Sequence, residues 1–238
     1  MRAEVHAGER VYQSKERYNM RTIMKKFIPL TIFAIAFGLV EAAVVVYTRW
    51  LYYPNGFAFP VGMPPLAFIK VELWRELATL AMLGAAGALA GRGGWQKFAF
   101  FMWAFGVWDI FYYIWLNLFI GWPASLFDPD ILFLIPVTWW GPVLSPCIVS
   151  VSLCAAALVI VRRDEAEQMP VPKPLDVIGV AIGALIILYT YMADAAIITA
   201  GQMPPPYRWG IFWIGELLGA AAFINMFLRK PDGRSAAG

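Results

Sequence analysis

Runs of about twenty or more apolar residues, separated by short polar connections, extend along almost the whole chain. Because about 20 residues of α-helix cross the hydrocarbon core of a bilayer, this pattern predicts six membrane-spanning helices. They are expected at residues 27–49, 66–90, 98–121, 131–161, 176–200 and 209–228. The predicted fold class is therefore an all-α integral membrane protein. A six-helix bundle would occupy residues 27–228, between a basic tail at 1–26 and a short tail at 229–238.

The fourth apolar run is too long for one straight helix, and it holds Pro136, Pro142 and Pro146. Each proline removes a backbone donor and crowds the preceding turn of a helix. The fourth span is therefore expected to be kinked or partly re-entrant. A short leading segment followed by a helix from about Trp140 is the favoured form.

Lysine and arginine residues gather on one side of the predicted bundle. Fifteen of the nineteen lie in the two tails or in the second and fourth connections. Positively charged loops remain on the cytoplasmic side of a membrane. The pattern predicts a multi-pass protein of the cell membrane with both termini in the cytoplasm.

The composition agrees with membrane insertion and excludes several other classes. Only 15% of the residues are charged and 61% are apolar, whereas soluble domains have about 25% charged residues. The net charge is only +3 and no basic patch is present, which argues against a nucleic-acid partner. The single histidine, His6, lies in the tail, which argues against histidine-ligated metal or haem in the membrane. No cofactor can be identified, and other membrane subunits remain open as partners beside the lipid bilayer.

Five of the six predicted spans carry an acidic residue well inside the apolar run. A carboxylate at the centre of a bilayer costs at least ~2.5 kcal/mol, so five such spans indicate a buried polar site. The candidate ligand-binding residues are these acids and the polar side chains within one helical turn of them. They are Glu41, Glu72, Arg75, Glu76, Asp109, Tyr112, Tyr113, Asp194 and Glu216.

The depth of these acids can be counted from the outer helix ends. With 1.5 Å of rise per residue, they lie roughly 9–18 Å below those ends, in the outer half of the bilayer. Aromatic residues accompany them, as Tyr112 and Tyr113 follow Asp109. The sequence therefore predicts an outer-half cavity with aromatic walls and carboxylates as its polar groups.

The charges inside the predicted membrane region do not balance, because six carboxylates accompany Arg75, with only Lys70 nearer the surface. Either several acids are protonated or a cation binds among them. A metal ion, an organic cation or transported protons would each satisfy this requirement. The structural alternative is that Arg75 clamps two helices together and the other acids serve as interhelical hydrogen-bonding groups.

No phosphate-binding glycine loop, nucleophile elbow or metalloprotease motif is present. The leading hypothesis is a membrane protein of transport or solute-binding type whose cavity takes a proton, a cation or a small solute. The alternatives are a carboxylate-based membrane enzyme acting on a lipidic substrate, and a structural or assembly subunit of a membrane complex. The expected architecture resembles that of the substrate-capturing subunits of vitamin importers, although no motif of those proteins is present.

Overall fold

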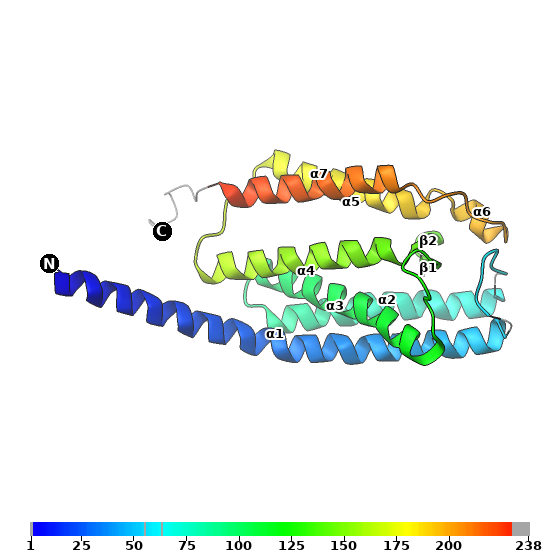
Figure 1. Cartoon of the computed structure of the whole chain (residues 1–238), viewed down its shortest axis with the longest axis horizontal. Coiled ribbons are helices and arrows are strands. Elements are labelled where there is room, and N and C mark those ends of the chain that lie inside the picture. Colours follow the sequence, from blue (N-terminus) through cyan, green and yellow to red (C-terminus); the bar gives the residue numbers. More distant parts are fainter. Residues whose placement is uncertain (1, 55, 63, 230–238) are drawn as a thin grey trace.

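The computed structural model describes residues 2–54, 56–62 and 64–229, with side chains from residue 25 onward within those ranges. The described chain is mostly helical (Figure 1), with its elements in the order α1 (Arg2–Tyr52), α2 (Leu66–Ala90), α3 (Gly94–Ile120), β1 (Pro129–Phe133), β2 (Trp139–Pro142), α4 (Leu144–Glu165), α5 (Pro174–Met192), α6 (Ala195–Thr199) and α7 (Trp209–Leu228). Within that part of the chain, five helical segments are long and apolar enough to cross a membrane. They lie in α1, α3, α4, α5 with α6, and α7.

The sixth long helix, α2, is not among these segments, and Lys70, Glu72, Arg75 and Glu76 lie in its first half. Its crossing of the membrane remains a prediction. The start of α1 and the end of α7 lie at the same end of the bundle (Figure 1). We call this the tail end, and the opposite end, which carries β1 and β2, the hairpin end.

The predicted tail at 1–26 is helical as far as it is described, because α1 runs without interruption from Arg2 to Tyr52. The predicted tail at 229–238 lies outside the described residues, apart from Arg229. The fifth predicted span is divided into two helices. Helix α5 ends at Met192, and the short helix α6 begins at Ala195, so that Asp194 occupies the break between them.

The leading segment of the fourth predicted span is a β-hairpin. Strands β1 and β2 pair antiparallel, and α4 begins at Leu144, four residues later than predicted. The prolines explain this arrangement, because Pro136 lies in the turn between the strands and Pro142 ends β2. Pro146 lies in the first turn of α4, where its missing N–H has no intrahelical partner to lose. Residues 129–142, where the sequence predicted a short leading segment before the fourth helix, therefore contain two short strands, while the described chain is mostly helical.

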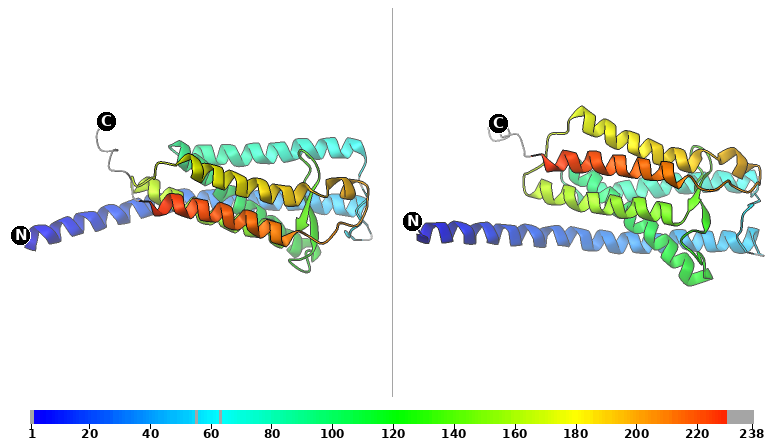
Figure 2. Two further views of the ribbon diagram at one scale, coloured as in Figure 1. Left: turned by 90° about the horizontal axis from the view of Figure 1, so that it is seen from above. Right: turned by 45° about the horizontal axis from the view of Figure 1, so that its top comes forward.

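The helices form two groups. The main hydrophobic core lies in the first group, where α3 packs against α1, α2 and α4 around residues such as Leu83, Phe100 and Ala157. Helices α5 and α7 form a second group, a pair that runs side by side in both views of Figure 2. Glycine explains how closely this pair approaches, because a Cβ atom on Gly183 would lie 2.7 Å from the backbone oxygen of Gly215.

Replacing Gly183 by Leu should separate α5 from α7, because the new side chain would meet backbone atoms of Gly215 and Gly219 that cannot rotate away. Overpacking of this kind costs on the order of 1–3 kcal/mol. We expect the thermal midpoint of the purified protein, followed by tryptophan fluorescence, to fall by several degrees. Gly84→Ala is the matched control, because a Cβ atom on Gly84 of α2 meets nothing within 4 Å. An unchanged midpoint in Gly183→Leu would contradict the close packing of α5 and α7.

Candidate functional site

A cavity of about 1030 Å³ separates the α5–α7 pair from the first group of helices. Its walls come from α1 to α5, α7 and the β-hairpin. On α3, the cavity-lining residues recur every three or four positions, as Phe98, Met102, Phe105, Asp109 and Tyr112 do. This spacing places one face of the helix against the cavity along most of its length.

Eight of the nine candidate residues predicted from the sequence line this cavity, namely Glu41, Glu72, Arg75, Glu76, Asp109, Tyr112, Tyr113 and Glu216. The ninth, Asp194, does not line it. Its carboxylate accepts a hydrogen bond of 2.9 Å from Arg208 Nη2 and one of 3.3 Å from Trp140 Nε1. Asp194 therefore ties the α5–α6 break to the β-hairpin and to the start of α7.

Arg75 joins α2 to α1. Its guanidinium pairs with Glu41 of α1 and with Glu72 of its own helix. Glu41 also accepts a hydrogen bond from the Thr79 hydroxyl. These contacts match the interhelical clamp that the sequence left as an alternative, so Glu41 and Glu72 are already provided with a counter-ion.

Glu76 has a different kind of partner. Both of its carboxylate oxygens accept a hydrogen bond from the backbone N–H of Leu134, each at 3.0 Å. Leu134 directly follows β1, so Glu76 holds the β-hairpin against α2. Among the described side chains, no Lys or Arg forms an ion pair with Glu76.

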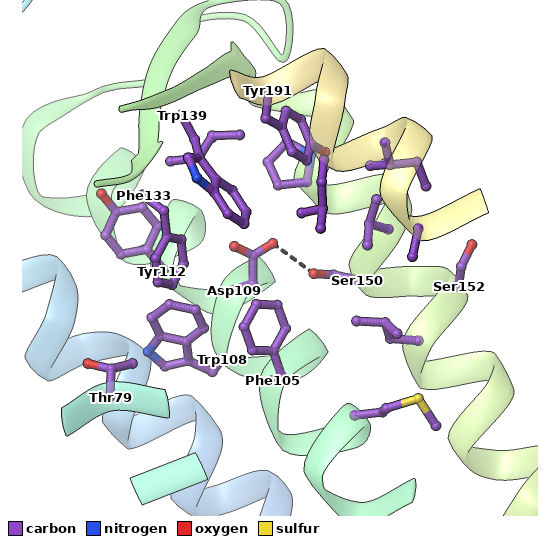
Figure 3. A pocket seen from close by; sticks show the side chains of 18 of the residues that line it. Thr79, Phe105, Trp108, Asp109, Tyr112, Phe133, Trp139, Ser150, Ser152 and Tyr191 are labelled. Carbon is purple, nitrogen blue, oxygen red and sulfur yellow. Dashed lines mark hydrogen bonds between the residues drawn. The ribbon is translucent and has the colours of Figure 1, made fainter. Parts of the chain in front are cut away.

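Asp109 lines the cavity and has a neutral partner. Its carboxylate accepts a hydrogen bond of 2.8 Å from the Ser150 hydroxyl of α4, and no described cationic side chain pairs with it. Figure 3 shows this carboxylate among aromatic side chains from three parts of the chain. They are Phe105, Trp108 and Tyr112 of α3, Phe133 and Trp139 of the hairpin strands, and Tyr191 of α5.

Three polar atoms of this aromatic wall have no partner within the described protein. The indole N–H groups of Trp108 and Trp139 and the hydroxyl of Tyr191 are each buried without a hydrogen bond. A buried donor without an acceptor costs about 1–3 kcal/mol, so such groups commonly mark a site that a bound molecule completes. The wall of the cavity therefore carries buried polar groups without partners, together with a carboxylate that has no described counter-ion.

Arg49 and Asp130 complete the charged lining, and neither was among the site residues predicted from the sequence. Arg49 Nη2 lies 3.2 Å from Asp130 Oδ1, and the two residues are 6% and 3% exposed. The Arg49 guanidinium also lies 4.2 Å from the ring centre of Phe57 and 3.7 Å from that of Trp122. Arg49 stands at a predicted helix end and Asp130 in a predicted connection, so neither had the intramembrane position used to select candidates.

Burial raises the pKa of Asp130 to about 6, although the charge of Arg49 acts in the opposite direction. Desolvation of a carboxylate in this enclosed position therefore outweighs the attraction of the adjacent guanidinium. The Asp130 ion pair is one of the polar contacts on which the hairpin end depends.

The charge count made from the sequence needs correction, because Arg49 pairs with Asp130 and Arg208 with Asp194. The excess of acid over basic side chains nevertheless remains. Six carboxylates of the cavity lining (Glu41, Glu72, Glu76, Asp109, Asp130 and Glu216) accompany two arginines, Arg49 and Arg75. A seventh lining acid, Asp176 at the tail end, pairs with Arg229.

Within the described residues, no three His, Cys, Asp or Glu side chains are grouped so that they could hold a metal ion.

Aromatic residues of the hairpin-end connections pack over this charged lining. Phe57 contacts Trp122 edge to face, and Phe59 and Tyr207 both lie against Trp140. Aromatic residues in such connections either cover a site or form an ordinary belt at the membrane interface. The contacts between the three connections support a cover.

Comparison of the chain with protein-family models, curated proteins and solved structures gives no match. The resemblance to importer subunits remains a prediction.

Proposed function

We propose that this membrane protein is of the transport or solute-binding type and binds an organic cation in its cavity. The observation that carries the proposal is the environment of Asp109. This carboxylate has a serine as its hydrogen-bonding partner, lacks a described counter-ion, and stands among six aromatic residues at the wall of the cavity.

Each part of this arrangement suits a cation with an apolar body. The carboxylate supplies the opposite charge, and the faces of Trp, Tyr and Phe attract a cation by about 0.5–2 kcal/mol each. The excess of acids over arginines in the lining favours a positive ligand over an anionic one. Among the cations considered from the sequence, an organic one is favoured over a metal ion, since the described acids do not gather as metal ligands.

The predicted orientation gives the site a place in the membrane. If the tail end is cytoplasmic, the charged lining lies in the outer half of the bilayer beneath the aromatic cover. Opening of the cover, or movement of the α5–α7 pair, would then expose the site to one side at a time, as transport requires. The localisation in the cell membrane with both termini inside is part of the same proposal.

Replacing Asp109 by Asn should weaken binding of tetraphenylphosphonium, an aromatic cation, at least tenfold. Asn retains the size of the side chain and can still accept the Ser150 hydrogen bond, so the variant loses mainly the charge. Binding of the labelled cation is measured on purified protein by scintillation proximity, and its uptake is then measured in proteoliposomes.

Glu167→Gln is the matched control, because Glu167 is an exposed acid outside the cavity. Triphenylphosphine oxide, which is aromatic but neutral, should compete poorly for the wild-type site. Equal affinity of the wild type and Asp109→Asn for the cation, or equal competition by the neutral compound, would refute the proposal.

The enzyme alternative keeps one specific observation in its favour. Glu72 is held by Arg75, but Glu76 and Asp109 are free of cationic partners among the described residues and could act as an acid and a base. Mass spectrometry of lipid extracts incubated with the protein separates the two functions. An enzyme would convert a lipid into a product, whereas a binding protein would return its ligand unchanged.

A further inference from the structure

The half of the cavity nearer the tail end differs from the charged half near the hairpin. Apart from Asp176, which pairs with Arg229, its walls are apolar, and they include Phe98, Met102, Val159, Ala181, Ala220 and Ile224. We call this half the apolar trough. Phe98 precedes Asp109 by eleven residues on α3, so the trough extends roughly 16 Å from the carboxylate toward the tail end.

The trough is open sideways, whereas the charged half is enclosed. Phe98, Val177 and Ile224, which line the trough, are 53%, 55% and 54% exposed. In the charged half, Glu41, Glu76, Trp108 and Asp130 are buried. The exposed wall belongs to helices of membrane-spanning length and apolarity, so the surroundings of the opening are expected to be lipid.

Small residues create the room in the trough. Helices α5 and α7 approach one another through Gly183, Gly215 and Gly219, and this close contact keeps the pair together. The pair meets α4 at separate points, where the Ser152 hydroxyl donates to Glu216 and Arg163 Nη2 donates to the backbone oxygen of Phe227. Ala181 and Ala220 then present only methyl groups to the cavity. The total volume of about 1030 Å³ is at the upper end of the range for small-molecule pockets, so a compact cation at Asp109 would leave much of it unfilled.

We propose that the natural ligand is a long-chain amphiphile that reaches the cavity from the membrane, with its cationic head at Asp109 and its chain in the apolar trough. This inference rests on the proposed function and specifies the class of ligand. Lipid tails are as apolar as the trough, so moving a chain from one to the other changes the free energy little. The trough therefore provides space for the chain, and the binding of the charged head at Asp109 determines which amphiphiles are selected.

The position of the chain can be mapped with a photoreactive probe. The probe is a dodecyltriphenylphosphonium with a diazirine at the end of the chain, added to the protein in phosphatidylcholine nanodiscs. We expect the label on trough residues of α5 and α7, in the peptides that contain Ala181 and Ala220. An excess of tetraphenylphosphonium, which has the head but no chain, should reduce this labelling at least fivefold.

Two variants test the trough without altering the head site. Ala181→Trp on α5 and Ala220→Trp on α7 would each fill it, and each should abolish labelling of the trough while tetraphenylphosphonium binding stays within twofold of the wild type. The variants lie on two different helices, so that if one of them fails to fold, the other still tests the trough. Ala221→Trp is the control, because the exposed Ala221 does not line the cavity.

Label found only on outward-facing residues such as Leu185 and Ile214, or trough labelling that tetraphenylphosphonium does not reduce, would overturn this inference. It would also be overturned if both tryptophan variants were labelled as strongly as the wild type. Failure of the wild type to bind tetraphenylphosphonium at all would instead refute the proposed function. The two failures are therefore distinguishable.

Discussion

Replacing Arg49 by Met should lower the thermal midpoint of the purified protein strongly at pH 7.5 and much less at pH 5. Arg49 and Asp130 form a buried ion pair, and the guanidinium is stacked between Phe57 and Trp122. Removing one member of such a pair leaves an uncompensated buried charge, which costs about 3–5 kcal/mol. Met retains much of the length of the Arg side chain. The fall in thermal midpoint would therefore reflect mainly the lost charge and its stacking, and to a smaller extent the lost volume.

The pH dependence follows from the carboxyl group that remains. Burial raises the pKa of Asp130 to about 6, compared with about 3.8 for an aspartate in an unfolded chain. A raised pKa means that the contribution of Asp130 to stability is fully present below about pH 4 and is lost as the pH rises through 6. Without Arg49 the opposing charge disappears and this pKa rises further. The variant would therefore carry a neutral Asp130 at pH 5 and lose little there.

Asp130→Asn provides the control for both statements. Combined with Arg49→Met, it should restore most of the loss in thermal midpoint at pH 7.5, because neither member of this ion pair is then charged. On its own, Asp130→Asn should remove the contribution that titration of Asp130 makes to the change of stability between pH 4 and 7. An equal loss of stability in Arg49→Met at both pH values would show that packing, and not charge, explains the contact.

Replacing Arg75 by Met should also destabilise the protein by several kcal/mol, because Glu41 and Glu72 would both lose their counter-ion. Glu41 is only 4% exposed, so its charge cannot be relieved by water. We expect a thermal midpoint well below that of the wild type. Binding of tetraphenylphosphonium should be weakened less in Arg75→Met than in Asp109→Asn, since Arg75 pairs with Glu41 and Glu72 and not with Asp109.

A double-mutant cycle between Arg75→Met and Glu41→Gln measures this clamp. Contacting charged residues show coupling energies of about 0.5–3 kcal/mol, and we expect a value near the top of that range. The double variant should be more stable than Arg75→Met alone. Additive losses in the cycle would mean that the two side chains do not act together, and the assignment of Arg75 as a clamp between α1 and α2 would be wrong.

The sequence alone located most of the helices, because each hydrophobic run of membrane length must satisfy its backbone hydrogen bonds within itself. The predicted segments at 66–90 and 209–228 coincide with α2 and α7. It also selected eight side chains that line one cavity, because an acidic residue in an apolar run stands out without any tertiary information. The hairpin at residues 129–142 was less accessible, since the prolines excluded a helix but did not specify strand pairing.

Only the tertiary structure decided which acids have a partner. Arg49 and Asp130 are 81 residues apart, and nothing in either local sequence connects them. The same holds for the Leu134 N–H that occupies Glu76, and for the aromatic residues from three parts of the chain around Asp109. A residue type and its depth along a helix are local properties. The direction in which that helix turns its polar face depends on how it packs against the others. This packing gives Glu41 and Glu72 an arginine as counter-ion and gives Asp109 a serine as its hydrogen-bonding partner.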